Sequence, residues 1–234
     1  MRLLNAIQYD LKLQFRHGFY YAYLIVCIMF VVVIRSFPVG IRTQVLTVGL
    51  LTDPSILGFF FLGGIILLEK GQNTLEGLFI TPIRMSEYIW SKVISLTVLA
   101  LLSCLVICIG SVGFSCNLFW FIVGIGLTSI LFVLLGFTLV SITKTVNTYL
   151  LSSPIYGAIT MIPLLGYFNI VKSPLFYLVP TQSSLTLIDG AFRPRPIGEM
   201  LLSVVLLLVF IYLAWLWASK WFNKYIVQRT GEAS

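Results

Sequence analysis

Long apolar runs separated by short polar segments follow one another along most of the chain. A helix needs about 20 apolar residues to cross the hydrocarbon core of a bilayer. The whole chain, residues 1–234, is therefore expected to form one all-α integral membrane domain. The pattern predicts six membrane-spanning helices, at 19–34, 45–68, 92–112, 118–142, 149–167 and 200–217.

Residues 1–18 follow a different pattern from the apolar runs. Apolar side chains recur every four residues from Leu3 to Phe15 and so share one helical face, whereas charged residues such as Asp10 lie mostly off it. This spacing predicts an amphipathic helix that lies in the membrane interface. The alternative is a plain cytosolic helix that leads into the first span.

The composition supports the prediction of a membrane protein, and the distribution of charge indicates on which side of the membrane the termini lie. The chain is 59% hydrophobic and 10% charged, against about 45–50% and about 25% in average soluble domains. The net charge of +7 falls in short segments between apolar runs, so it indicates topology and not nucleic-acid binding. Ten of the 15 Lys and Arg lie in the termini and in 69–92 and 141–148, which predicts that both termini are cytoplasmic.

Residues for catalysis are scarce. The chain has a single His and no G-x-x-x-x-G-K-[ST] phosphate loop, which argues against a His-based metal site and against ATP hydrolysis by this chain. An intramembrane enzyme would need a paired nucleophile and base, or two acids within the spans, and only Asp53 qualifies. We therefore expect that the chain is not an enzyme and binds no metal or cofactor.

Asp53 is the one acid expected at membrane depth, and two interpretations stay open. An intramembrane carboxylate is costly and often functional, so Asp53 is a candidate residue of the substrate path, or a partner of Arg35 or Arg42. Alternatively, Asp53 is an N-cap with Pro54 at the first helical position. In that case Asp53 either dips below the outer interface or sits where a shallow re-entrant piece at 45–52 meets a short span.

The segment 69–92 contains the start and stop signals of a short helix between two spans. Asn73 followed by Glu76 resembles a capping box. Leu75 and Leu78 then supply an apolar face, and a Thr-Pro pair ends the helix. The helix is either a connector that rests on the membrane or a docking surface for a cytoplasmic partner.

The pattern E-K-G-x-x-T-L-E-x-L-x-x-T-P-x-x-x-x-E-Y-x-x-x-K of 69–92 resembles the loop after the second span of ABC-2-type transporter permeases. The layout of an amphipathic N-terminal helix, six spans and a long outer segment at 168–199 is also similar. In that family the short helix is the coupling helix, which sits in a groove of a separate ATPase subunit. The resemblance implies that the ATPase-coupling residues are Glu69, Asn73, Thr74, Leu75, Glu76, Leu78, Thr81 and Pro82.

The same resemblance implies the partners and the reaction. Two ATPase subunits would carry ATP and Mg²⁺, and a second permease chain would complete a homodimer or a close heterodimer in the cytoplasmic membrane of a prokaryote. Outer re-entrant helices are expected in 168–199, and the cargo is expected to be a hydrophobic or amphipathic drug, lipid or peptide. The chain is most similar to small drug-export permeases of the fluoroquinolone-export type. The alternatives are a haem-exporter permease of cytochrome c maturation and a secondary transporter or channel without an ATPase.

Overall fold

The computed structural model describes residues 2–16, 18–71, 84–114, 116–143, 145–171 and 174–222, and every regular element in these ranges is helical. The α-helices are α1 (Arg2–Arg16), α2 (Phe19–Arg35), α3 (Val39–Ile56), α4 (Leu62–Gly71), α6 (Met85–Val112), α7 (Leu118–Ile142), α8 (Val146–Thr160), α9 (Leu164–Tyr167), α10 (Pro180–Gly190) and α11 (Ile197–Phe222). A π-helix, η1 (Leu57–Phe61), joins α3 to α4, and a 3₁₀ helix, η2 (Pro174–Leu178), precedes α10.

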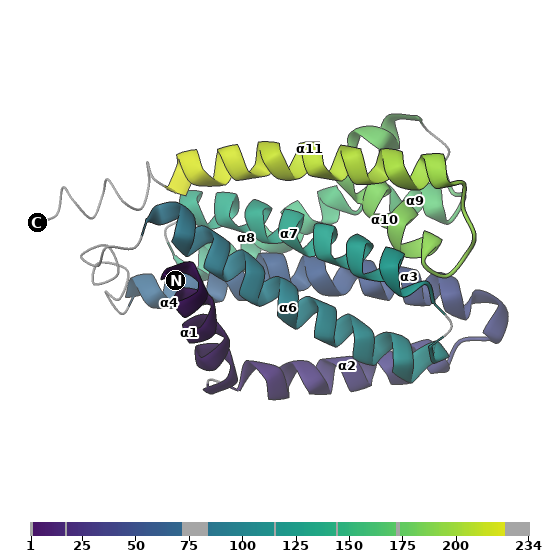
Figure 1. The fold of residues 1–234 in the computed structure, drawn as a ribbon, viewed down its shortest axis with the longest axis horizontal. Helices are drawn as coiled ribbons and strands as arrows, with labels where there is room; N and C mark the ends of the chain where they lie inside the picture. The colour runs from purple at the N-terminus through teal and green to yellow at the C-terminus, as the bar shows by residue number, and fades with distance from the viewer. Residues whose placement is uncertain are drawn as a thin grey trace, which may run out of the picture.

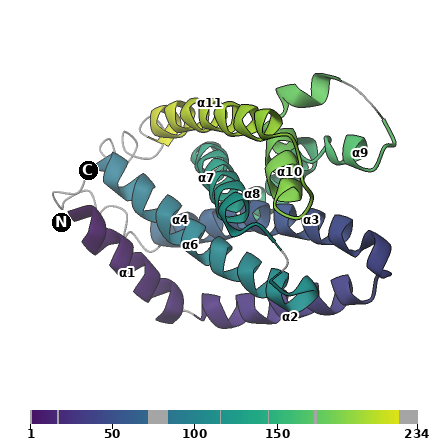
Figure 2. The ribbon, with the colours of Figure 1, turned by 45° about the vertical axis from the view of Figure 1, so that its right-hand side comes forward.

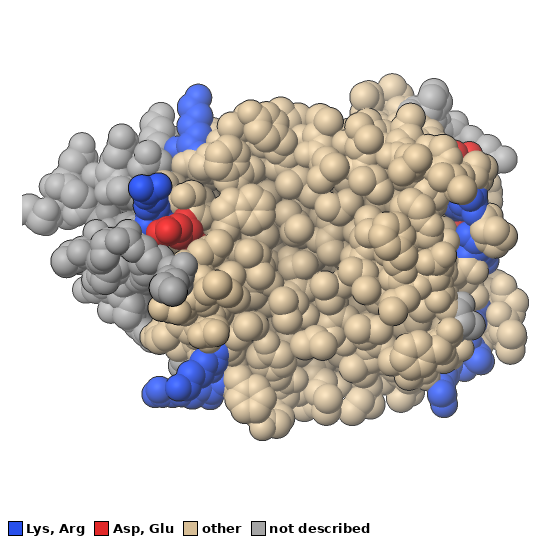
Figure 3. Space-filling model, in the orientation of Figure 1, with Lys and Arg blue, Asp and Glu red and all other residues tan. Residues whose placement is uncertain are grey.

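The long helices run side by side along the long axis of the molecule, and α1 lies across one end of them (Figure 1). The end of α4, the start of α6 and the end of α11 lie at that same end, which we call the inner end. Helices α9 and α10 lie at the opposite, outer end (Figures 1 and 2). On the face drawn in Figure 3, the charged side chains gather at the two ends and leave an uncharged band between them.

Four described helices are long and apolar enough to cross a membrane: Val39–Gly71, Met85–Val112, Leu118–Ile142 and Ile197–Phe222. They correspond to the predicted spans two, three, four and six. A fifth candidate is the pair Leu3–Arg16 and Tyr20–Arg35, which is bent by 70°. The bend follows from Gly18, whose φ of 77° is unfavourable for residues with a Cβ. The prediction of a polytopic helical membrane protein is therefore confirmed, and the six-span layout stays a prediction.

Helix boundaries differ from the prediction in the second and third spans. The second helical run starts at Val39 and continues through Pro54 to Gly71, with no separate shallow piece at 45–52. Helix α6 starts at Met85 instead of residue 92, because the Arg84 backbone N–H donates to Glu87 Oε2 over 2.8 Å and caps the additional turns. Of the predicted 69–92 loop, only 72–83 is outside the described residues.

Close helix contact near the middle of the bundle depends on glycine. A Cβ on Gly58, in η1, would lie 2.5 Å from the backbone carbon of Phe132, in α7. A Cβ on Gly136 would meet the carbonyl oxygen of Gly58. The two helices therefore touch through their backbones, a contact typical of small residues at membrane helix interfaces.

Candidate functional site

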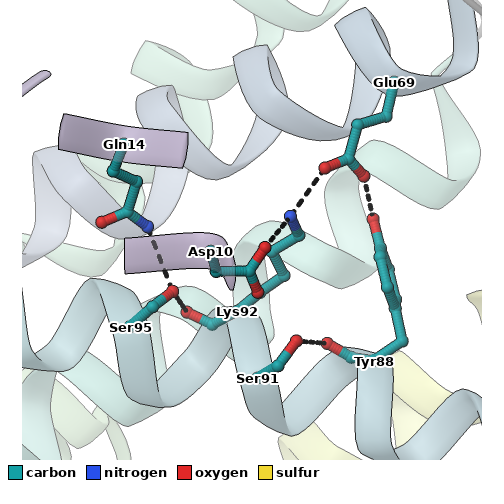
Figure 4. A network of polar contacts seen from close by, with 7 residues as sticks. All are labelled: Asp10, Gln14, Glu69, Tyr88, Ser91, Lys92 and Ser95. Atoms are coloured by element: carbon teal, nitrogen blue, oxygen red, sulfur yellow. Dashed lines mark hydrogen bonds and ion pairs between the residues drawn. The ribbon is translucent and has the colours of Figure 1, made fainter. Parts of the chain in front are cut away.

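Three groups of buried polar side chains connect the helices, one at each end and one near the middle. The first, which we call the inner network, contains Asp10 and Gln14 from α1, Glu69 from α4, and Tyr88, Lys92 and Ser95 from α6 (Figure 4). It lies at the inner end, between the two helices that lead into and out of residues 72–83.

Lys92 is the centre of the inner network. Its Nζ donates to Asp10 Oδ1 over 2.7 Å and to Glu69 Oε1 over 2.6 Å. The side chains are largely removed from solvent, with relative exposures of 4% for Lys92, 7% for Asp10 and 14% for Glu69. Removal of one member of a buried ion pair leaves an uncompensated charge, so such a pair fixes the position of the helices that carry it.

Tyr88 extends the network to two more helices. Its hydroxyl donates to Glu69 Oε2 over 2.6 Å. Its ring packs against Phe137 of α7 and Phe222 of α11, with centroid distances of 6.3 Å and 5.7 Å. One tyrosine of α6 therefore contacts α4 and the inner ends of α7 and α11.

The amphipathic helix α1 takes part through its polar side. Asp10 and Gln14 are buried against α6, and Gln14 Nε2 donates to Ser95 Oγ over 3.1 Å. Leu4 and Phe15 are instead 62% and 57% exposed. The apolar periodicity of α1 predicts that Asp10 lies off the face that contacts other groups. In the structure Asp10 instead pairs with Lys92 of α6.

The second group surrounds Asp53, near the middle of the run from Val39 to Gly71. Its carboxylate is 1% exposed, and Oδ2 accepts from Ser103 Oγ over 2.5 Å and lies 3.5 Å from Cys104 Sγ. The interpretation of Asp53 as an N-cap is wrong, because α3 continues past it to Ile56 and its side chain points at α6. The proposed pairing with Arg35 or Arg42 is also wrong, since both arginines donate to backbone carbonyls.

The helix around Asp53 is irregular, and side chains from other helices satisfy its carbonyls. Pro54 has no N–H for the carbonyl of Leu50, and Cys104 Sγ lies 3.8 Å from that oxygen. In the following π-helix, the Tyr149 hydroxyl donates to the carbonyl of Phe59. Interrupted helices with side-chain-bonded carbonyls are typical of substrate and ion sites in transporters.

The third group closes the outer end around Asp189, at the end of α10. Arg195 donates to Asp189 Oδ2 through Nε and Nη2, over 3.0 Å and 2.7 Å, and the Tyr167 hydroxyl donates to Oδ1 over 2.7 Å. Asp189 is 1% exposed. The bidentate pair ties the end of α10 to the turn before α11, the tyrosine adds the end of α9, and we expect the group to be structural.

The sequence-predicted coupling residues are only partly described. Glu69 lies in the inner network, whereas Asn73, Thr74, Leu75, Glu76, Leu78, Thr81 and Pro82 lie outside the described residues. The roles of Asp10, Tyr88 and Asp189 were missed. For Asp189 a signal was present, namely one acid in a Ser/Thr-rich helix with arginines four and six residues later.

A helical bundle with an apolar middle (Figure 3) and several membrane-capable helices defines a polytopic membrane protein. The chain belongs to the fluoroquinolones export permease protein family, whose family model matches residues 1–230. Two similar relatives are the fluoroquinolones export permease proteins of Mycobacterium tuberculosis strains CDC 1551 / Oshkosh and ATCC 25618 / H37Rv. Each is 30% identical over 233 residues, covering 98% of both chains. The predicted resemblance to fluoroquinolone-export permeases is thus confirmed.

Proposed function

We propose that this chain is the membrane subunit of an ATP-driven ABC-2-type exporter. Its cargo is an amphipathic drug of the fluoroquinolone kind, which it moves out across the cytoplasmic membrane of a prokaryote. Family membership supports drug export over the haem-exporter alternative. The sequence has no phosphate loop, so ATP and Mg²⁺ belong on a separate ATPase.

The observation that carries the proposal is the position of Lys92 between Asp10 and Glu69. Glu69 lies three residues before the segment 72–83, and Lys92 lies nine residues after it, in α6. The inner network therefore joins both ends of the proposed coupling segment to α1. A movement that an ATPase imposes on residues 72–83 would shift α4, α6 and α1 together, and Tyr88 would pass it to α7 and α11.

The complete exporter is proposed to contain two ATPase subunits and two permease chains, with both termini of each permease chain in the cytoplasm. The excess of Lys and Arg in the termini and in 69–92 supports this orientation. Alternating exposure of a cavity between the permease chains would move the drug, and ATP binding would supply the free energy through the coupling residues.

Asp53 is proposed to act in the substrate path. It is 1% exposed among α3, α6 and α2, so a drug can contact it only when these helices separate. A carboxylate that hydrogen-bonds to neutral side chains suits the transient binding of a cationic amine, because it carries no competing ion pair within the described residues.

Copurification and reconstitution test the proposal. The permease is expressed with candidate phosphate-loop ATPases from its own genome, and the complex is assayed in proteoliposomes for ATP-dependent fluoroquinolone export. Leu75→Ala and Glu76→Gln are expected to reduce ATPase copurification and drug-stimulated hydrolysis, while the exposed Tyr212→Phe on α11 is the matched control. Export that persists without any ATPase, under an ion gradient alone, would instead establish the secondary-transporter alternative.

A further inference from the structure

A basic pocket lies at the outer end, remote from the inner network. It has a volume of about 480 Å³ and lies between the start of α3 and the end of α6. Its polar lining comes from Arg35, Arg42, Thr43 and Ser111, and its apolar lining includes Val39 and Ile109. We call it the arginine pocket. Its lining contains two guanidinium groups and no carboxylate.

The charge of the pocket is not balanced by the acids described at this end of the molecule. Asp189 and Glu199 are the acids there, and both are within ion-pair distance of Arg195 instead. Asp53 accepts from Ser103 and Cys104, as described above. Two guanidinium groups at a membrane surface, with no carboxylate partner within the described residues, attract an external anion.

Backbone carbonyls hold the two arginines in place but do not use all their donors. Arg35 Nε donates to the carbonyl of Gly110 over 2.6 Å, at the end of α6. Arg42 Nη2 donates to the carbonyls of Arg35 and Phe37, over 3.1 Å each, at the end of α2. These bonds set the position of the two guanidinium groups before any ligand binds.

Two buried polar atoms of the pocket have no partner within the described residues. They are Arg42 Nε and the hydroxyl oxygen of Ser111, and the Ser111 residue is only 5% exposed. A buried donor that has no acceptor destabilises the structure that contains it. A ligand with several acceptor oxygens would satisfy both groups, and phosphate matches the planar fork of arginine.

The surroundings of the pocket favour a ligand with a long apolar part. Val39 beside it is 78% exposed, and Val106 and Ile109 on the outward face of α6 are 45% and 41% exposed. These aliphatic side chains continue from the pocket toward the uncharged band of the molecule. A soluble anion would gain nothing from them, whereas the acyl chains of a lipid would cover them.

We propose that the arginine pocket binds the phosphate group of an anionic phospholipid in the leaflet at the outer end. Arg35 and Arg42 bind the phosphate oxygens, and Ser111 donates its hydroxyl to one of them. The acyl chains lie along Ile109 and Val106. The lipid then ties the turn between α2 and α3 to the end of α6, and this role does not depend on the proposed exporter function.

Native mass spectrometry of the delipidated full-length protein tests the proposal. The protein in detergent is titrated with phosphatidylglycerol or with phosphatidylcholine of the same acyl chains. We expect one phosphatidylglycerol to be retained under activation that removes phosphatidylcholine. Glycerol 3-phosphate serves as the soluble probe. Equal retention of both lipids, or equally tight binding of glycerol 3-phosphate, would overturn the lipid assignment.

Two variants locate the site, and one controls for net charge. Arg42→Gln removes a guanidinium, and Ser111→Asp gives the arginines a carboxylate partner while it repels phosphate. Each is expected to weaken phosphatidylglycerol binding about fivefold, since a basic residue near the surface contributes about 1 kcal/mol. Lys220→Gln removes an exposed charge from the last turn of α11, at the inner end, and should bind like the wild type.

The design separates loss of the ligand from loss of the fold. Because Ser111→Asp supplies a new ion pair, it is expected to keep the thermal midpoint of the lipid-free protein even if Arg42→Gln lowers it. Wild-type binding of phosphatidylglycerol by folded Ser111→Asp, or by both pocket variants, would refute the assignment of the pocket.

Discussion

Glu69 and Asp53 stand on the same long helical run, and the structure treats their charges differently. Glu69 lies within 2.6 Å of the Lys92 ammonium and accepts from the Tyr88 hydroxyl as well. Asp53 accepts from Ser103 and lies near Cys104, both neutral. The comparison shows that the carboxylate paired with Lys92 connects helices, whereas the buried carboxylate with neutral donors has no cationic partner within the described residues, and this is why we propose it for an external cation. We expect the two residues to respond in opposite ways to loss of charge.

Replacement of Lys92 should give the largest loss of stability. Lys92→Met leaves Asp10 and Glu69 buried side by side without a cation, at a cost of about 3–5 kcal/mol. The thermal unfolding midpoint in detergent should fall sharply, while Lys220→Met, at an exposed position near the end of α11, should leave it unchanged. A midpoint within error of the wild type would mean that the ion pairs do not hold the inner end together.

Replacement of Gly58 tests whether the middle of the bundle depends on backbone contact instead of charge. Gly58→Ala places a methyl group 2.5 Å from the backbone carbon of Phe132, which cannot move aside as a side chain could. We expect a loss of about 1–3 kcal/mol from overpacking. Gly64→Ala is the control, because a Cβ there has no neighbour within 4 Å. Equal midpoints for the two variants would contradict the close approach of η1 and α7.

Replacement of Asp53 should have the smallest effect on stability. Asp53→Asn keeps an oxygen that accepts from Ser103, and it removes the cost of a buried charge. The thermal midpoint should stay equal to that of the wild type or rise, while export of a cationic drug falls. Glu69→Gln should instead lower the midpoint, because Lys92 then loses one of its two partners. Wild-type export by Asp53→Asn at normal expression would end its proposed role in the path.

The sequence could predict the helical membrane fold because apolar periodicity and length are local properties. It also indicated a short helix within 69–92, since residues that start and end helices can be recognised in the sequence even when the partner protein is unknown. The pairing of Asp10 with Lys92 could not be predicted, because it joins residues 82 positions apart. The apolar face of α1 suggested the wrong side for Asp10, because the periodicity cannot show that a polar side chain finds an ammonium on α6.

The error at Asp53 has a local physical cause. An Asp-Pro pair is equally compatible with a helix start and with a helix that continues, provided that another group satisfies the carbonyl four residues before the proline. Here the thiol of Cys104 lies 3.8 Å from the Leu50 oxygen, and η1 takes up the distortion that follows. Neither contact can be read from the sequence around Pro54 alone.

The central claim is that the inner network passes ATPase movement to the spans, and Tyr88→Phe tests it most directly. The change removes only the hydroxyl that donates to Glu69, and it keeps the ring against Phe137 and Phe222. The measurement is fluoroquinolone exported per ATP hydrolysed by the reconstituted complex, with Tyr212→Phe as the control. We predict a ratio about tenfold lower, as expected for loss of about 1.4 kcal/mol of coupling, with ATPase binding retained. An unchanged ratio in a folded Tyr88→Phe complex would contradict the account.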